Sequence, residues 1–260
     1  MIVTYNRRAA LERALKTLGN GFQVLVVDNG STDGTSSTLD LDFPDARFIR
    51  LPKNFGFTKA LNVGIRAADG EYVLLLHDDA LISGEAVTKL ADYLETRTDA
   101  TAVSPLLVDD AGTPMPQVRP IPTASAPDGE FVPATGDSGN CILGAATMYR
   151  LYFLRAIRQI DESYGTYGPD IELGWQVSRS GKKNAILRDV TAVHLALPSP
   201  AKAGALAGDR ASGTAAFLGI HSGMAAGLLY RLKTGLLGIL TFRFGVVSGV
   251  FGGVKIDGTN

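Results

Sequence analysis

The sequence predicts an α/β fold, with a mainly parallel sheet covered by helices on both faces. Strand-like and helix-like segments alternate up to about residue 105, an order typical of parallel sheets joined by crossover helices. Two expected strands, 23–27 and 71–76, are continuous apolar runs, as in strands buried on both faces. Both runs lead into aspartates, which places acidic side chains at the carboxyl edge of the sheet, where ligands bind.

The remaining elements follow in chain order. Apolar residues predict strands at 1–4, 23–27, 47–51, 71–76 and 101–104, and helices at 7–18, 58–68, 85–94 and 171–180. The turn-forming cluster 29–34 separates the second strand from the third. Residues 107–133 hold six of the twelve prolines, which favours a long loop or lid. Residues 141–154 are again rich in apolar side chains, and short strands are expected at 185–187 and 191–193.

Bulk composition excludes several classes of protein. The net charge of −1 gives no general reason to expect a nucleic-acid partner. A single cysteine, Cys141, excludes an internal disulfide framework and is typical of a reducing compartment, so we expect a cytoplasmic protein. The N-terminus is charged after a short apolar start and predicts no signal peptide. No uncharged apolar run reaches about 18 residues, so no membrane span is expected.

Asp28 and the triplet His77-Asp78-Asp79 end the two buried strands. A carboxylate at the first position can accept a hydrogen bond from a nucleotide base or ribose, although it could equally cap the following turn. The adjacent carboxylates Asp78 and Asp79 repel each other and favour a bound cation. Mg²⁺ or Mn²⁺ would bridge two phosphates there, and an N-cap for the helix near residue 83 is the alternative.

Asp170 and Glu172 follow Pro169, which is typical of a helix start. Carboxylates are favoured at a helix N-terminus for electrostatic reasons alone, but one of these two could also act as a general base. His194 follows a short apolar strand. It is either a structural histidine or a nitrogen ligand beside a carboxylate-bound ion.

Taken together, residues 1–195 resemble the family 2 glycosyltransferases, which have the GT-A fold. The matching segments, in order, are Val3–Arg7, Val26–Thr35, Asn54–Ile65, His77–Asp79, Gly144–Met148, Asp161–Glu162, Asp170–Leu173 and His194. The resemblance implies direct displacement at the anomeric carbon of a nucleotide diphosphate sugar, with inversion.

The resemblance also assigns roles to residues. The donor would be held by Thr4, Tyr5, Asn6, Asp28, Asn29, Lys53, Asn54, Gly56, Asn62, His77 and Asp78. Asp79 and His194 would hold Mg²⁺ or Mn²⁺, and Asp170 would be the base. Two departures stand out: Pro169 replaces a common Glu, and Glu172 replaces a common Asp, which leaves open which acid takes the proton. The short opening strand indicates either a clipped strand or residues missing before Met1.

Within the family, the spacing is similar to that of bacterial rhamnosyltransferases of cell-surface polysaccharide assembly, and Asp170-x-Glu172-x-Gly174 resembles galactofuranosyltransferases. A UDP- or dTDP-sugar donor is implied, with a glycan or lipid-linked acceptor. A catalytically degenerate sugar-nucleotide-binding protein is one alternative. A nucleotidyltransferase is another, but its glycine-rich phosphate loop is missing from the opening segment 4–8.

The expected organisation is a GT-A catalytic domain at 1–197, with a donor half to about 105 and an acceptor half from about 135, a linker at 198–213 and a C-terminal amphipathic helical region at 214–260. In that region Leu228, Leu229, Leu232, Leu236, Leu237 and Leu240 could form one apolar helical face among basic residues. Such a face could lie on the inner surface of the plasma membrane. Packing against the catalytic domain and homo-oligomer formation are the alternatives.

Overall fold

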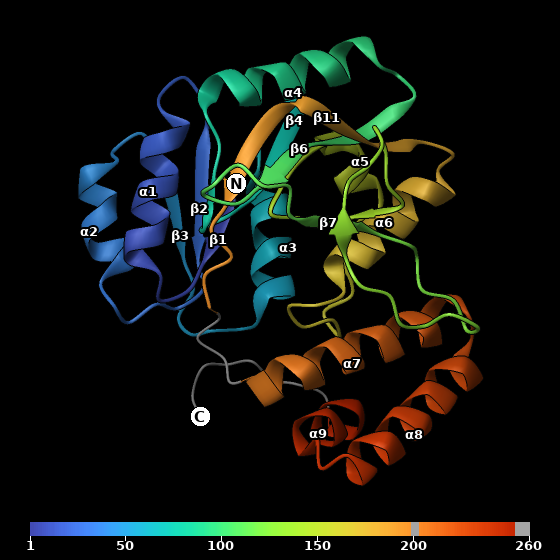
Figure 1. The fold of residues 1–260 in the computed structure, drawn as a ribbon. Helices are drawn as coiled ribbons and strands as arrows, with labels where there is room; N and C mark the ends of the chain where they lie inside the picture. Colours follow the sequence, from blue (N-terminus) through green and yellow to red (C-terminus); the bar gives the residue numbers. More distant parts are fainter. Residues whose placement is uncertain (199–202, 253–260) are drawn as a thin grey trace.

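The computed structural model describes residues 1–198 and 203–252 (Figure 1). The first half contains β1 (Ile2–Thr4), α1 (Arg8–Leu18), β2 (Val24–Asp28), α2 (Thr35–Asp42), β3 (Ala46–Arg50), α3 (Phe57–Ala67), β4 (Tyr72–His77), β5 (Ala80–Leu81), α4 (Gly84–Thr96) and β6 (Ala100–Val108). The second half contains β7 (Pro116–Arg119), β8 (Val132–Pro133), β9 (Cys141–Ile142), β10 (Ala146–Arg150), α5 (Leu151–Ala156), α6 (Pro169–Arg179), β11 (Lys183–His194), α7 (Ala203–His221), α8 (Met224–Leu240) and α9 (Phe244–Gly252).

The main sheet has eight strands in the order β3-β2-β1-β4-β10-β6-β11-β5. The pairs β3–β2, β2–β1, β1–β4 and β6–β11 are parallel, whereas β10 and β5 are antiparallel to their neighbours. Thr4 is in register with Asp28, and Val3 with His77. The carboxyl ends of β1, β2 and β4 therefore meet at one edge, as expected from the sequence.

Helices cover both faces of this sheet and form two separate apolar cores. Leucines of α1 and α4 pack on one face, among them Leu11, Leu90 and Leu94. The other face is covered by α3, α5 and α6, which contribute residues such as Leu61 and Leu173. The predicted α/β class with a mainly parallel sheet and two helical layers is confirmed.

Residues 107–133 are more ordered than the predicted loop. β6 extends to Val108, and β7 pairs with β8 and β9 in a second, three-stranded sheet. Gln117 of β7 is fully buried, and its amide donates to Ser104 Oγ at 2.9 Å and to the Pro105 carbonyl at 2.6 Å. A polar side chain holds this strand in place, so apolar periodicity could not reveal it.

Two further elements differ from expectation. The strands expected at 185–187 and 191–193 are one strand, β11, with a register irregularity between Leu187 and Thr191. Helix α2 was not predicted, because its segment looks like a continuation of the turn cluster and shows little apolar periodicity.

The expected linker 198–213 is largely wrong, since α7 is helical from Ala203; residues 199–202 lie outside the described range. The small residues that suggested a linker let helices approach closely. A Cβ added to Gly249 of α9 would lie 2.3 Å from Gly208 of α7, so glycine is needed at that contact. The C-terminal helical extension is confirmed, while the domain boundaries stay a prediction.

Candidate functional site

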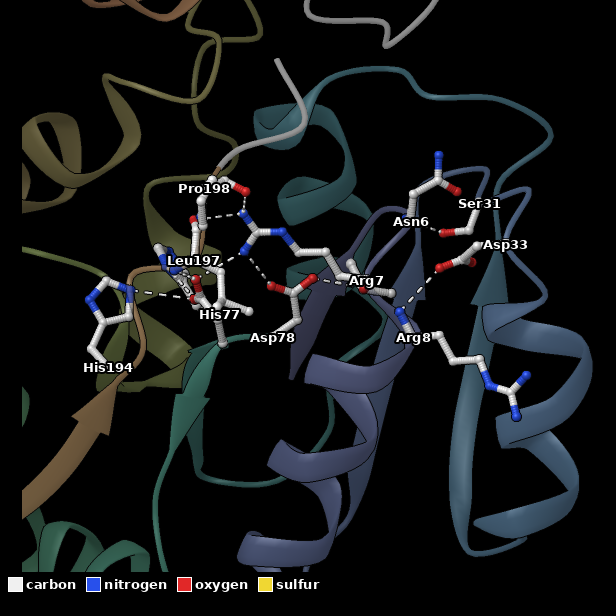
Figure 2. A network of polar contacts seen from close by, with 12 residues as sticks. Asn6, Arg7, Arg8, Ser31, Asp33, His77, Asp78, His194, Leu197 and Pro198 are labelled. Carbon is white, nitrogen blue, oxygen red and sulfur yellow. Dashed lines mark hydrogen bonds and ion pairs between the residues drawn. The ribbon is translucent and has the colours of Figure 1, made fainter. Parts of the chain in front are cut away.

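The loops after β1, β4 and β11 converge at the carboxyl edge of the sheet (Figure 2). Thr4, buried at the end of β1, donates from Oγ1 to Asp78 Oδ2 at 2.8 Å. Asp78 and Asp79 are both buried, at 6% and 4% exposure. Thr4 was predicted to contact the nucleotide, but here its hydroxyl holds a carboxylate of the acidic triplet.

His77, Asp79 and His194 form a cluster of potential metal ligands. One ligand atom of each lies within 4.8 Å of the others, with His194 Nε2 at 3.4 Å and His77 Nδ1 at 4.0 Å from Asp79 Oδ1. The pairing of β5 with β11, which sets His194 opposite Ala80, brings these distant segments together. The structure thus unites the two predicted ligands, Asp79 and His194, and adds His77, which was predicted as a donor contact.

The protonation states of His77 and Asp79 at neutral pH are those that a cation site requires. Burial and the neighbouring His194 lower the pKa of His77 to about 4, so its ring is neutral at pH 7 and keeps a free lone pair. Burial alone would raise the pKa of Asp79, but the hydrogen bond from His194, the charge of Arg7 and the charges that both histidines carry at low pH lower it. Asp79 is therefore ionised at neutral pH. A carboxylate and two imidazoles are a suitable donor set for a divalent cation.

Arg7 links the acidic triplet to the segment after β11 (Figure 2). Its Nη1 lies 2.9 Å from Asp79 Oδ2 and 3.3 Å from Asp78 Oδ1. Its Nη2 donates to the carbonyls of Leu197 at 3.0 Å and Pro198 at 2.9 Å. Sequence reasoning did not single out this residue, although a cation in the loop after the opening strand, at the edge where the two acids were expected, is a usable signal.

Asp170 lies at the N-terminus of α6, after Gly168 and Pro169. A cavity of about 20 Å³, room for about one water, is lined by His77, Gly144 and Asp170 among others. Burial of the carboxyl raises the pKa of Asp170 to about 6, although the Gly144 N–H, Arg119 and His194 lower it in part. A Cβ on Gly144 would come within 2.5 Å of Asp170 Oδ1, so only glycine leaves this carboxylate in place.

Glu172, the other candidate base, has both carboxylate oxygens in contacts with other side chains. Its Oε2 accepts from the Tyr164 hydroxyl at 2.9 Å and lies 2.7 Å from His221 Nε2 of α7. Its Oε1 accepts from Gln176 at 2.8 Å. The His221 ring packs against Trp175, with ring centroids 3.8 Å apart. Glu172 therefore ties α6 to α7, which leaves Asp170 as the acid that faces the cluster.

Several predicted donor contacts hold the loops to one another. Asn29 donates to Asn54 Oδ1 at 2.8 Å and to the Gly56 carbonyl at 3.2 Å. Asn6 accepts from the Thr32 N–H at 2.8 Å, and Asp28 from the Ser31 N–H at 2.9 Å.

Among the other predicted donor contacts, Asn62 exchanges two hydrogen bonds with the backbone of Ile160. Its side chain fixes the segment that leads to α6. Lys53 is exposed, with Nζ 5.4 Å from the centroid of the Phe55 ring. Tyr5 is half-buried, as are Asn6, Asn54 and His77. Of the predicted donor contacts, Lys53 is therefore the one with an exposed side chain.

Arg119 of β7 is a second residue that sequence reasoning missed. It is 6% exposed, and its Nε atom has no hydrogen-bond partner among the described residues. Its guanidinium lies 5.7 Å from the centroid of the Phe131 ring, and its charge lowers the pKa of Asp170. A buried positive charge thus acts on the carboxyl group of Asp170.

Comparison with known proteins places this site in context. The family model described as "Glycosyl transferase family 2" matches residues 1–160. An N-acetylglucosaminyl-diphospho-decaprenol L-rhamnosyltransferase of Mycobacterium tuberculosis is 25% identical over 231 residues, which cover 74% of each chain.

Solved structures share the fold. A structure of GalNAc-T7 with UDP, GalNAc and Mn²⁺ superposes with a TM-score of 0.64 at 13% identity, over 84% of this chain and 46% of that one. A mannosyltransferase of Pyrobaculum calidifontis with GDP-Man and Mn²⁺ gives 0.58 at 18% identity, over 97% and 85%. Among the described residues, no helix combines the length and apolarity needed to cross a membrane.

Proposed function

The chain belongs to glycosyl transferase family 2, and from that premise we propose that it is a metal-dependent, inverting enzyme. It transfers a sugar from a nucleotide diphosphate donor to a hydroxyl of a glycan or lipid-linked acceptor. The observation that carries this proposal is the cluster of His77, Asp79 and His194 beside Asp170 at the carboxyl edge of the sheet. In this proposal, the three clustered side chains are the cation ligands and Asp170 is the general base, at the edge where a donor and an acceptor would meet.

The donor is a UDP- or dTDP-sugar, because the carboxylate of Asp28 can accept the N3–H of uracil or thymine alike. Tyr5 and Lys53 border the same loops and would contact the base or a phosphate. The similarity to a rhamnosyltransferase over 74% of each chain supports rhamnose as the sugar and a role in cell-surface polysaccharide assembly.

Asp79, His77 and His194 would hold the divalent ion. When bound, this ion supplies Lewis-acid stabilisation for the charge of the departing diphosphate. The two imidazole nitrogens favour Mn²⁺ over Mg²⁺, because Mg²⁺ prefers an all-oxygen set of ligands.

Asp170 performs the proton transfer. Its carboxylate takes the proton of the acceptor hydroxyl while the hydroxyl oxygen bonds to the anomeric carbon. The bond from that carbon to the donor phosphate breaks on the opposite side, and its electron pair leaves with the nucleoside diphosphate. A single displacement of this kind inverts the anomeric centre. With a pKa of about 6, Asp170 is mostly ionised at neutral pH and still basic enough to accept a proton.

The proposal is tested by incubating the native chain with a panel of UDP- and dTDP-sugars and Mn²⁺. The measured reaction is hydrolysis of the donor, in which water replaces the acceptor and the nucleoside diphosphate is released. We expect release from one donor class, lost in Asp170→Asn. Asp69→Ala is the matched control, since Asp69 is exposed and distant from the site in the fold. Nucleotide binding without release from any donor would contradict turnover and favour a degenerate binding protein.

A further inference from the structure

Helix α8 exposes a broad apolar face. Its exposed large apolar residues are Met224, Leu228, Leu229, Leu232, Leu236, Leu237, Ile239 and Leu240, each between 52% and 87% exposed. We call these residues the α8 face. They recur at helical spacing, and Lys233 is the one charged residue exposed among them in α8. Monomeric proteins rarely leave so continuous an apolar surface in water.

The opposite side of α8 is already used for packing. Gly227, Tyr230, Gly235 and Gly238 are buried, and a Cβ on Gly227 would lie 2.8 Å from both the Ala215 carbonyl oxygen and the Gly219 Cα of α7. Figure 1 shows α7 between α8 and the sheet, with α8 on the outer side of the helical group. The catalytic domain therefore does not cover the α8 face in this fold.

The apolar surface continues into the turn between α8 and α9. Phe242 and Phe244 are 79% and 65% exposed, and their rings pack edge to face with centroids 6.4 Å apart. Phe242 has a left-handed backbone, with φ of 55°, which is unusual for a bulky residue. The chain thus holds two aromatic rings outward on a strained turn, a costly arrangement in water.

The charge of this region is of one sign. No acidic residue occurs between Asp209 and Asp257, whereas Lys233 and Arg243 are exposed beside the apolar residues. A second copy of the chain seated face to face would bring these cations together. Anionic lipid headgroups would instead neutralise them while the leucines and phenylalanines enter the acyl boundary.

We propose that the α8 face, with Phe242 and Phe244, docks the protein on an anionic membrane surface. The helix lies in the plane of the interface, since no described helix can cross the bilayer. This inference goes beyond the proposed function and does not depend on the donor or on turnover.

The test is co-sedimentation of the full chain with vesicles of phosphatidylcholine alone and of phosphatidylcholine mixed with phosphatidylglycerol. We expect binding to the mixed vesicles that is weaker at high salt and about tenfold or more weaker for the double variant Leu232→Glu/Leu236→Glu. Lys233→Glu/Arg243→Glu should remove the preference for the anionic lipid. Tyr152→Glu on α5, 62% exposed and outside the face, should bind as the native chain does.

Thermal unfolding and light scattering complete the design. Both double variants replace exposed residues, so their unfolding temperatures should match that of the native chain. Equal binding to neutral and anionic vesicles would overturn the proposal. So would a native dimer that binds no vesicles and dissociates in Leu232→Glu/Leu236→Glu, because the occupant of the face would then be a second copy.

Discussion

Arg7 and Asp79 meet at one oxygen of the carboxylate, with Nη1 2.9 Å from Oδ2, while the other oxygen, Oδ1, faces both histidines. The Leu197 N–H also donates to Oδ2, at 3.0 Å. Asp79 thus uses one oxygen to hold the chain after β11, while the other faces the two imidazoles of the proposed cation site. Fixing a ligand through its second oxygen is a common way to orient a metal site.

The link from Arg7 to Leu197 and Pro198 predicts local mobility when it is removed. In Arg7→Met, the carbonyls of Leu197 and Pro198 lose their donor, so we expect faster hydrogen–deuterium exchange at the amides of residues 195–197. Arg8→Met is the matched control, because Arg8 joins this network through its backbone N–H to Asp33. Unchanged exchange in Arg7→Met would mean that the segment is held by other contacts.

Asp170 predicts the acid limb of the pH–rate profile. The base works when ionised, and its pKa is about 6, so activity should fall as the pH drops through about 6 and level off above it. A bound cation would move this limb to lower pH. We expect Asp170→Asn to lower the rate by about 10²–10⁴-fold and to lose the limb. A limb that survives in Asp170→Asn would assign it to another group.

Arg119 predicts a shift of that same limb. Its positive charge lowers the pKa of Asp170, so removal in Arg119→Met should raise this pKa and move the limb to higher pH. The exposed Arg66→Met, in α3, serves as the control. If the acid limb of both variants lies at the same pH as that of the native protein, the charge of Arg119 does not affect the pKa of Asp170.

Glu172 and Asp170 should separate stability from catalysis. Glu172→Ala leaves Tyr164 and His221 without their shared partner, which should cost about 1–3 kcal/mol of unfolding free energy. The Michaelis parameters of the folded fraction should change little, whereas Asp170→Asn should spare stability and lower kcat. Urea unfolding measured beside initial rates decides this, and the reverse pattern would make Glu172 the base.

Asp209 of α7 predicts an unusual pH dependence of stability. It is buried and accepts the N–H groups of Thr166 and Tyr167 at 2.8 and 2.9 Å. Burial raises the pKa of Asp209 from 3.8 to about 6, against the effect of these two hydrogen bonds. The folded state therefore holds the proton more tightly, and stability falls as the pH rises from about 4 to about 6.

Asp209→Asn keeps an acceptor oxygen for the two N–H groups and does not titrate. Its stability relative to the native chain should rise across this window, by up to about 3 kcal/mol above pH 6. Denaturant unfolding at several pH values measures this difference. Parallel stability curves for the two proteins would show that Asp209 keeps an ordinary pKa.

Strands β2 and β4 could be predicted because they are continuous apolar runs, and helices α1, α3 and α4 because each has a clear apolar stripe. Asp79 and His194 were proposed as metal ligands from their residue types, with capping and structural roles as alternatives, and the resemblance favoured the ligand role. Local sequence does not show that β5 and β11 pair and bring the two residues together. Their role as ligands stays a prediction.

Other features could not be predicted because their causes are not local. β7 is held by the buried amide of Gln117, and α7 owes its small residues to helix contacts such as that of Gly208 with Gly249. Arg7 reaches a segment 190 residues away. Such contacts exist only after folding, so a periodicity argument does not detect them.

The proposed metal site is tested most directly by calorimetric titration of UDP and dTDP, with and without Mn²⁺, into the native chain and Asp79→Ala. We expect binding of one nucleotide that requires Mn²⁺ and is lost in Asp79→Ala, with the control Asp69→Ala unaffected. Failure of both diphosphates to bind with any metal, or equal binding by Asp79→Ala, would contradict the claim that His77, Asp79 and His194 form the donor's metal site.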